Sequence, residues 1–299
     1  MVAVSFRSMQ TIEANSRSSS LPEKQRLALI SLLADDDPHI YNTIRSKLLS
    51  YGSAAEEWLR AEILSNDPTM RRRAREILEH RARRRAHLKF LDHCGRHGKE
   101  LDLEESTFLL ARTRYPEINQ DAYVALLDAW AGELQLRLAK SYSSESKLAD
   151  FNRHLFEKLG FSGHEHYGYD PESCYLNRIV DKRRGNPIGI CAVYLFLARR
   201  TGMPIAGISL PGHFICRYQT ASSEVFVDCF RRGALLTKSD CIKYLLQSSQ
   251  GLVEGQLSPV TPRRILQRMC RNLITTYGHL EQTEEAVRAQ HYLEALSTK

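Results

Sequence analysis

Three residues have the types and spacing of a thiol catalytic triad. Cys191 lies in the apolar run NPIGICAVYLFLARRTGM, a predicted buried helix that Pro187 opens and Gly202 closes. His213 begins a later run of strand-forming residues, and Asp228 ends the next such run. A thiol in the first turn of a helix gains thiolate character from the helix dipole. An imidazole can accept its proton, and a carboxylate can orient the imidazole.

The chemistry that this arrangement predicts is acyl transfer. The thiolate of Cys191 would attack an amide or ester carbonyl, and the acyl-thioenzyme would be resolved by water or by an amine. Water would make the protein a peptidase, isopeptidase or deamidase, and an amine would make it a crosslinking enzyme. The predicted oxyanion donor is the Cys191 backbone N–H.

The same residues also have a structural interpretation. Cys191 can be a core thiol on an apolar helix, because free cysteine packs like a small hydrophobic residue. His213 can cap the preceding Pro-Gly turn, and Asp228 can accept backbone hydrogen bonds at a strand end. Cys216 and Cys229, beside the two triad partners, are expected to be packing residues.

The elements around these residues predict an α+β fold. Residues 21–90 are helical in pattern and contain two similar units, opened by Asp37-Pro38 and Asp67-Pro68, that resemble HEAT-type hairpins. A second helical stretch runs from about residue 101 to 160. The runs IAGISLP, HFICRY and EVFVDCF then predict an antiparallel meander. Two helices from 261 to 296 could form one tetratricopeptide-like unit.

Composition narrows the class of protein. The 299 residues are 42% hydrophobic and 26% charged, which is globular composition. We expect no membrane span and no secretory signal, because the chain has no apolar run of the length that either requires. The seven cysteines are an odd number with no CxxC pair, which favours a reducing compartment, and we expect the cytoplasm.

The net charge of +7 has a local source. The run 71–89 holds eight Arg, one Lys and two Glu, a balance of 9 − 2 = +7. A solvated helix face is the simplest interpretation, and binding of phosphate or of an acidic protein is the alternative. No nucleic-acid-binding signature accompanies the run, so we expect no nucleic-acid partner. The candidate basic patch consists of Arg81, Arg83, Arg84 and Arg85.

No metal or cofactor is predicted. Two groups contain metal-binding residue types without the paired spacing of a structural zinc site. They are His93, Cys94 and His97, and His164, His166 and Cys174. The glycines form no phosphate-binding loop.

Several segments together carry a family resemblance. They are LLARTRYPEIN, LFEKLGFSG, YDPESCYLNRIVDKRRGNPIGICAVY, GISLPGHFICRY and VFVDCFRRGALLT, within residues 102–236. This stretch resembles the bacterial transglutaminase-like family with a tetratricopeptide tail, the SirB invasion-regulator group. The resemblance implies a papain-like core in which Cys191, His213 and Asp228 would be the triad. Many relatives have Ser at the position of Cys191, and Asn186 stands where relatives have Ile. The resemblance to papain-like enzymes also implies that Asn186 or, alternatively, Asn177 supplies an oxyanion-stabilising amide.

The sequence thus predicts four segments and a leading function. The segments are a flexible tail (1–20), a helical HEAT-like region (21–100), a transglutaminase-like domain (101–250) and a C-terminal helical pair (251–299). The leading function is acyl transfer on a protein or peptide without a cofactor. The alternatives are a catalytically inactive interaction or regulatory module, and a nucleic-acid-associated factor that uses the arginine-rich helix. The oligomeric state is not predicted.

Overall fold

A computed structural model describes residues 21–96, 101–248 and 255–297. The predicted tail 1–20 lies outside the described residues. The α+β prediction is confirmed: helices come first, a small four-stranded antiparallel sheet follows, and a helix pair ends the described chain. The chain divides into two units, Met1–Arg85 and Ala86–Lys299. The HEAT-like assignment and the predicted segment boundaries remain predictions.

The described part of the first unit is helical and has its own small core. Asp37 and Asp67 accept hydrogen bonds from the backbone N–H groups of His39 and Thr69, as expected of N-cap residues before Pro. Buried apolar residues from every α-helix of the unit form one cluster. The elements are α2 (Glu23–Ser31), η1 (Leu32–Ala34), α3 (Pro38–Ser50), α4 (Ser53–Arg60), η2 (Glu62–Leu64) and the first part of α5 (Pro68–Gly95).

The second unit holds the predicted triad. After the end of α5 come the helices α6 (Leu103–Arg114), α7 (Gln120–Leu138) and α8 (Ser144–Asn152), the π-helix η3 (Arg153–Lys158), and the short elements β1 (Ser162–Gly163), η4 (Tyr167–Tyr169) and η5 (Pro171–Cys174). Three elements precede the sheet in the sequence: α9 (Leu176–Lys182), β2 (Arg184–Gly185) and α10 (Pro187–Thr201). Three helices follow it: α11 (Lys238–Gln247), α12 (Pro262–His279) and α13 (Thr283–Ser297).

The four-stranded sheet is the predicted meander with one more strand. Its order is β3-β4-β5-β6, and every neighbouring pair is antiparallel. In its register, Leu210 lies opposite His213 and Cys216 lies opposite Val227. The strands are β3 (Ile205–Leu210), β4 (His213–Gln219), β5 (Glu224–Asp228) and β6 (Ala234–Leu236).

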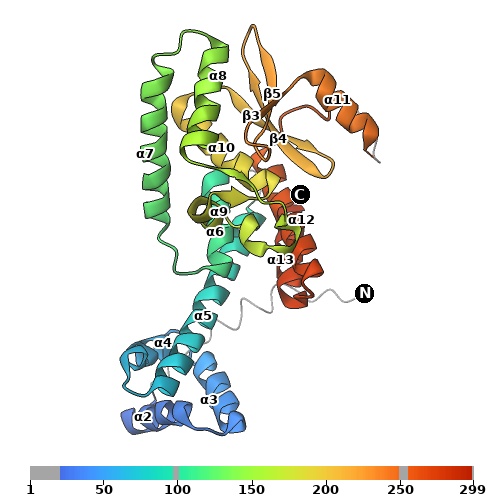
Figure 1. Cartoon of the computed structure of the whole chain (residues 1–299). Coiled ribbons are helices and arrows are strands. Elements are labelled where there is room, and N and C mark those ends of the chain that lie inside the picture. Colours follow the sequence, from blue (N-terminus) through green and yellow to red (C-terminus); the bar gives the residue numbers. More distant parts are fainter. Residues whose placement is uncertain (1–20, 97–100, 249–254, 298–299) are drawn as a thin grey trace. The chain divides into compact units, whose positions relative to one another are not determined.

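Helices cover both faces of this sheet. Helix α10 packs on β3 and β4 and also contacts α7, which pairs with α8, whereas α11 contacts β5 and β6 (Figure 1). The apolar side chains of the sheet divide accordingly. Phe214, Cys216 and Val227 join the main core with α10, and Ile215 and Phe226 join a separate cluster with α11. This division follows from the alternation of side chains along a strand.

Helix α10 begins and ends as the sequence predicts. Asn186 is its N-cap and accepts a hydrogen bond from the Gly189 N–H at 2.8 Å, and Pro187 is the first helical residue. Gly202 ends the helix with a φ of 67°, in the left-handed region that glycine adopts without strain. The helix is buried along most of its length, so its side chains face the core in several directions.

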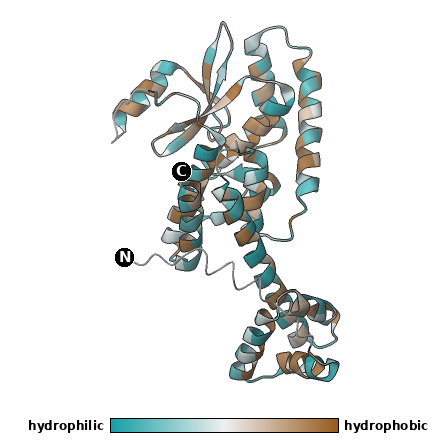
Figure 2. Cartoon of the chain, turned by 180° about the vertical axis from the view of Figure 1, so that it is seen from behind, coloured by the Kyte–Doolittle hydropathy of each residue, from teal (hydrophilic) through white to brown (hydrophobic). Residues whose placement is uncertain are grey.

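Hydrophobic and hydrophilic residues are mixed along the helices (Figure 2). Among the described residues, no helix combines the length and the apolar character needed to cross a membrane.

Candidate functional site

Two members of the predicted triad, His213 and Asp228, contact each other in the structure. His213 Nε2 lies 2.9 Å from Asp228 Oδ2. The imidazole is partly exposed, with 17% of its side chain accessible, whereas 3% of the Asp228 side chain is accessible. Because an ionised carboxylate can only accept, Nε2 is the donor of this hydrogen bond.

The turn after β5 holds the Asp228 carboxylate in place. Its Oδ1 accepts hydrogen bonds from the backbone N–H groups of Phe230 (3.1 Å) and Arg231 (3.2 Å). Its Oδ2 faces His213, and the Arg231 Nε lies 3.8 Å from that oxygen. Asp228 therefore accepts backbone hydrogen bonds after the end of β5 and also orients the imidazole. It makes the contacts of both its structural and its functional interpretation.

The His213–Asp228 pair belongs to the α11 face of the sheet. His213 lies opposite Leu210 in the register, and Leu210 belongs to the apolar cluster that contains residues of α11. Asp228 alternates with Val227, which faces the main core. Strand alternation therefore directs both side chains away from α10.

Cys191 lies on the opposite side of the sheet. It is the fifth residue of α10, one turn further from the helix start than predicted, and its accessible surface is 0%. Its Sγ donates a hydrogen bond to the Phe214 carbonyl oxygen at 3.5 Å. Within the described residues, no hydrogen bond joins Cys191 to His213. Burial raises the pKa of the Cys191 thiol well above its ordinary value, which favours the neutral form.

Cys191 instead belongs to a group of three sulfurs, which we call the three-thiol cluster. Its members are Cys191, Cys216 and Cys229, and their Sγ atoms all lie within 4.8 Å of one another. Each residue has an accessible surface of 0%. Sequence reasoning treated Cys216 and Cys229 as separate packing residues. The hairpin register would have placed both on one face, because Cys216 lies opposite Val227, two residues before Cys229.

The predicted oxyanion donors have other partners or positions. The Cys191 N–H lies too far along α10 to be free, because a helical N–H at the fifth position bonds to the first carbonyl. Asn186 accepts from Gly189 through Oδ1 and donates from Nδ2 to the Cys174 sulfur at 3.1 Å, so its amide caps the helix. Asn177 lies on α9 with 3% exposure, and its Oδ1 is buried without a hydrogen-bond partner.

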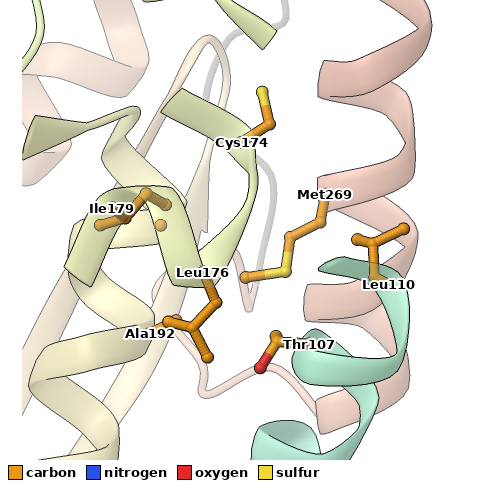
Figure 3. A pocket seen from close by; sticks show the side chains of 8 residues that line it. Thr107, Leu110, Cys174, Leu176, Ile179, Ala192 and Met269 are labelled. Atoms are coloured by element: carbon orange, nitrogen blue, oxygen red, sulfur yellow. The ribbon is translucent and has the colours of Figure 1, made fainter. Parts of the chain in front are cut away.

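A small cavity lies beside the start of α10. Figure 3 shows Met269, Leu176 and Thr107 around it, together with Cys174. Its volume of about 10 Å³ holds one water molecule at most. Neither Cys191 nor His213 lines it, so this cavity is not a substrate pocket for the predicted triad.

Two aromatic side chains lie near His213, and one arginine bonds to the strand residue opposite it. Phe230 and Tyr244 have ring centroids 6.0 and 6.4 Å from the imidazole, and Tyr167 stacks edge-on against Phe230 at 5.5 Å. Arg268 donates to the Leu210 carbonyl oxygen at 3.4 Å. Burial and the nearby Arg271 lower the pKa of Arg268, while the hydroxyl groups of Tyr167 and Tyr244 oppose that change. Within the described residues, no carboxylate forms an ion pair with Arg268.

The candidate basic patch on α5 is largely paired within its own unit. Arg81 and Arg85 both bind the buried Glu56 carboxylate, with N–O distances of 2.8 and 2.5 Å. Arg83 lies 3.7 Å from Glu79. Of the four patch residues, Arg84 is the one without an ion pair to a described residue. Three of the four patch residues therefore form ion pairs with carboxylates of the same unit.

The two histidine-containing groups also have structural partners. His93 Nε2 lies 2.8 Å from the Ser106 hydroxyl, and Cys94 is buried nearby in the core, while His97 lies outside the described residues. His164 Nε2 lies 3.3 Å from Asp170. His166 contacts His164 through its ring, and Cys174 accepts from Asn186. Among the described residues, the group with metal-ligand geometry is the three-thiol cluster.

Comparison with protein families identifies the domain that contains these residues. Residues 121–271, half of the chain, match the family model described as the transglutaminase-like superfamily. The chain belongs to the transglutaminase-like superfamily. The match runs from the start of α7 into the first half of α12 and includes all four strands of the antiparallel sheet. We call this region the transglutaminase-like domain.

The chain is similar to bacterial and animal proteins. The chain is 32% identical over 194 residues to a UPF0162 protein of Xylella fastidiosa, covering 63% of this chain and 69% of that protein. A UPF0162 protein of Pseudomonas aeruginosa is 27% identical over 174 residues, 57% of this chain and 63% of that protein. Human F-box only protein 21 is 29% identical over 140 residues, which are 44% of this chain and 22% of that protein. No solved structure matches.

Proposed function

We propose that the transglutaminase-like domain is a non-catalytic module that binds an acidic peptide segment of a partner protein at the surface around His213. One observation carries this proposal: the partly exposed His213–Asp228 pair and the buried Cys191 thiol lie on opposite faces of the sheet. A nucleophile must reach both its base and its substrate. Cys191 is fully buried and its thiol bonds to the Phe214 carbonyl oxygen rather than to His213, which acts on it only electrostatically, whereas the His213 imidazole is partly exposed.

The surroundings of His213 favour an acidic peptide. Tyr244, 39% exposed, and the partly exposed Phe230 offer the aromatic contact area that protein interfaces favour. Arg268 supplies a cation without a carboxylate partner among the described residues, and it could bind an Asp or Glu side chain. In the neutral imidazole, Nδ1 of His213 can accept a peptide N–H, because Nε2 donates to Asp228.

A second candidate is the acyl-transfer enzyme that the sequence predicts. The 2.9 Å contact between His213 and Asp228 favours it, because an imidazole oriented by a carboxylate supplies two of the three residues of a thiol triad. This mechanism would require α10 and β4 to separate until the Cys191 sulfur reached the imidazole. The relation to the SirB invasion-regulator group and the tetratricopeptide-like nature of the C-terminal pair also remain predictions.

Peptide binding and catalysis can be tested on the same protein preparations. The binding probe is an array of Asp- and Glu-containing peptides, each beside its Asn- or Gln-substituted version. The variants are His213→Ala and Tyr244→Ala, and the matched control is Tyr142→Ala, a fully exposed tyrosine elsewhere in the domain. We expect acidic peptides to bind and both site variants to weaken binding by about tenfold or more, because interface aromatic residues carry much of the binding energy.

The catalytic arm uses a glutamine-containing peptide with a fluorescent primary amine, and an activated ester, with Cys191→Ala as the variant. We expect no turnover that depends on Cys191. Amine incorporation or ester hydrolysis that disappears in Cys191→Ala would overturn the proposal and favour the enzyme. Equal binding of acidic and neutral peptides, or site variants that bind as the Tyr142→Ala control does, would also overturn it.

A further inference from the structure

The three-thiol cluster is assembled from three separate elements. Cys191 comes from α10, Cys216 from β4, and Cys229 directly follows β5. The remaining cysteines, Cys94, Cys174, Cys241 and Cys270, are also buried, but they do not join this group. Packing alone requires a small apolar side chain at each position and does not require three sulfurs to converge.

The geometry points to a binding site for one soft, monovalent d10 cation of the Cu(I) class, coordinated by the sulfurs of Cys191, Cys216 and Cys229. A trigonal site with metal–sulfur bonds of about 2.3 Å places its sulfurs about 4.0 Å apart. The three Sγ atoms already lie within 4.8 Å of one another. Shifts of less than about 1 Å therefore convert the thiol cluster into a three-coordinate site.

The chemistry of the donors selects this class of ion. Thiolate ligands favour soft ions such as Cu(I), whereas carboxylate and water ligands suit Mg²⁺, Ca²⁺ and Mn²⁺. Structural Zn²⁺ takes four ligands, and the described group contains three. His213 and Asp228 belong to the other face of the sheet, so they do not supply a fourth side chain. An ion that accepts three sulfurs fits the donor set best.

Binding exchanges protons for the metal ion and transfers no electrons. Each sulfur that forms a metal–sulfur bond as a thiolate loses its S–H bond, and its proton leaves to the buffer. The Cys191 S–H, now bonded to the Phe214 carbonyl oxygen, would give up that hydrogen bond.

The test is an anaerobic titration of the reduced full chain with Cu(I) buffered by a chromophoric Cu(I) chelator. The probe is equilibrated for a long time because all three sulfurs are buried. We compare the wild-type chain with Cys216→Ser, and use Cys241→Ser and Cys174→Ser as controls for buried cysteines outside the cluster. We expect one Cu(I) per chain, at least about a tenfold loss of affinity in Cys216→Ser, and no loss in the controls.

X-ray absorption at the copper edge supplies the second readout, with an expected shell of three sulfurs. A shell of nitrogen or oxygen, or Cys216→Ser binding as tightly as wild type, would overturn the inference. So would tighter binding of Zn²⁺ than of Cu(I) in a competition titration. If circular dichroism shows that Cys216→Ser does not fold, Cys229→Ala and Cys191→Ala replace it. Cu(I) affinity equal to that of the wild-type chain in both variants would also overturn the inference. This inference does not depend on the proposed peptide binding.

Discussion

The thiol of Cys191 donates its hydrogen bond to the main-chain oxygen of Phe214 at 3.5 Å, one residue after His213. Phe214 belongs to the main core beneath α10, and its strand neighbours face the α11 side. The backbone of β4 therefore lies between the Cys191 sulfur and the side chain of His213. This single strand separates the predicted nucleophile from the predicted base.

Asp228→Ala should destabilise the protein more than His213→Ala. The Asp228 carboxylate accepts from two turn amides, Phe230 N–H and Arg231 N–H, which lose their partner when it is removed. We expect a loss of about 1–3 kcal/mol in the free energy of unfolding for Asp228→Ala. His213→Ala should cost less, because the imidazole is partly exposed. Urea unfolding measures both values, and equal losses would mean that Asp228 acts mainly through His213.

Asn186→Ala should cost more than the removal of an ordinary helix cap. Asn119, the exposed N-cap of α7, is the matched control, because it bonds to the Ala122 N–H alone. We expect about 1 kcal/mol for Asn119→Ala. Asn186→Ala should lose about 2–3 kcal/mol, since it leaves the buried Gly189 N–H unpaired and also removes the hydrogen bond from Asn186 to the Cys174 sulfur. Similar unfolding midpoints for the two variants would contradict the dual role of Asn186.

Glu104→Gln tests the buried ion network at the end of α10. Glu104 is 4% exposed and binds both Arg199 and Arg200. Glu104 is the buried carboxylate of this network, and its loss leaves the two arginines only the exposed carboxylates of Asp102 and Asp128, so we expect a loss of about 3 kcal/mol. Its neighbour Glu105 is exposed, and Glu105→Gln should change the unfolding free energy by less than about 0.5 kcal/mol. Thermal and urea unfolding of the two variants provide the measurement. Equal losses of unfolding free energy in both would contradict a stabilising role of the Glu104 ion pairs.

Acid should weaken the start of α6 through Asp102. Burial raises the pKa of this carboxyl, but hydrogen bonds from the Glu105 N–H and from Arg199 lower it by a larger amount. The pKa of Asp102 is therefore below its ordinary value. A carboxylate with a depressed folded pKa stabilises the protein above its unfolded pKa, and that stability is lost as pH falls through the folded pKa.

The stability difference between wild type and Asp102→Asn should therefore be largest near neutral pH. It should shrink as pH falls below about 4. Arg199→Gln should give a difference with the same sign, because it removes the ion pair with Asp102 and also the one with Glu104. Urea midpoints across this pH range provide the measurement. A difference that stays constant down to about pH 2 would show that the cap contributes through packing rather than charge.

Local signals in the sequence predicted many of the elements but not the relation between them. The Asp-Pro pairs, Pro187 and Gly202 mark helix ends because capping depends on a few neighbouring residues. His213 and Asp228 were predicted to lie side by side, since a hairpin sets their relation.

The position of Cys191 could not be predicted in the same way. Helix α10 is apolar on nearly all sides, so its periodicity does not show which residues face the sheet. Counting from Pro187 would have placed Cys191 in the second turn and out of reach of the free helix-end N–H groups. The convergence of three sulfurs required the packing of α10 on β4, which is a tertiary contact without a local signal.

Site-resolved alkylation tests most directly whether Cys191 is a core thiol or a nucleophile. The reduced, folded protein is treated with substoichiometric iodoacetamide from about pH 5 to about pH 9, and labelling of all seven cysteines is quantified by mass spectrometry. We predict that Cys191 reacts no faster than Cys270, which is equally buried. Selective labelling of Cys191 near pH 6 that disappears in His213→Ala would contradict this account and demonstrate a thiolate–imidazolium pair.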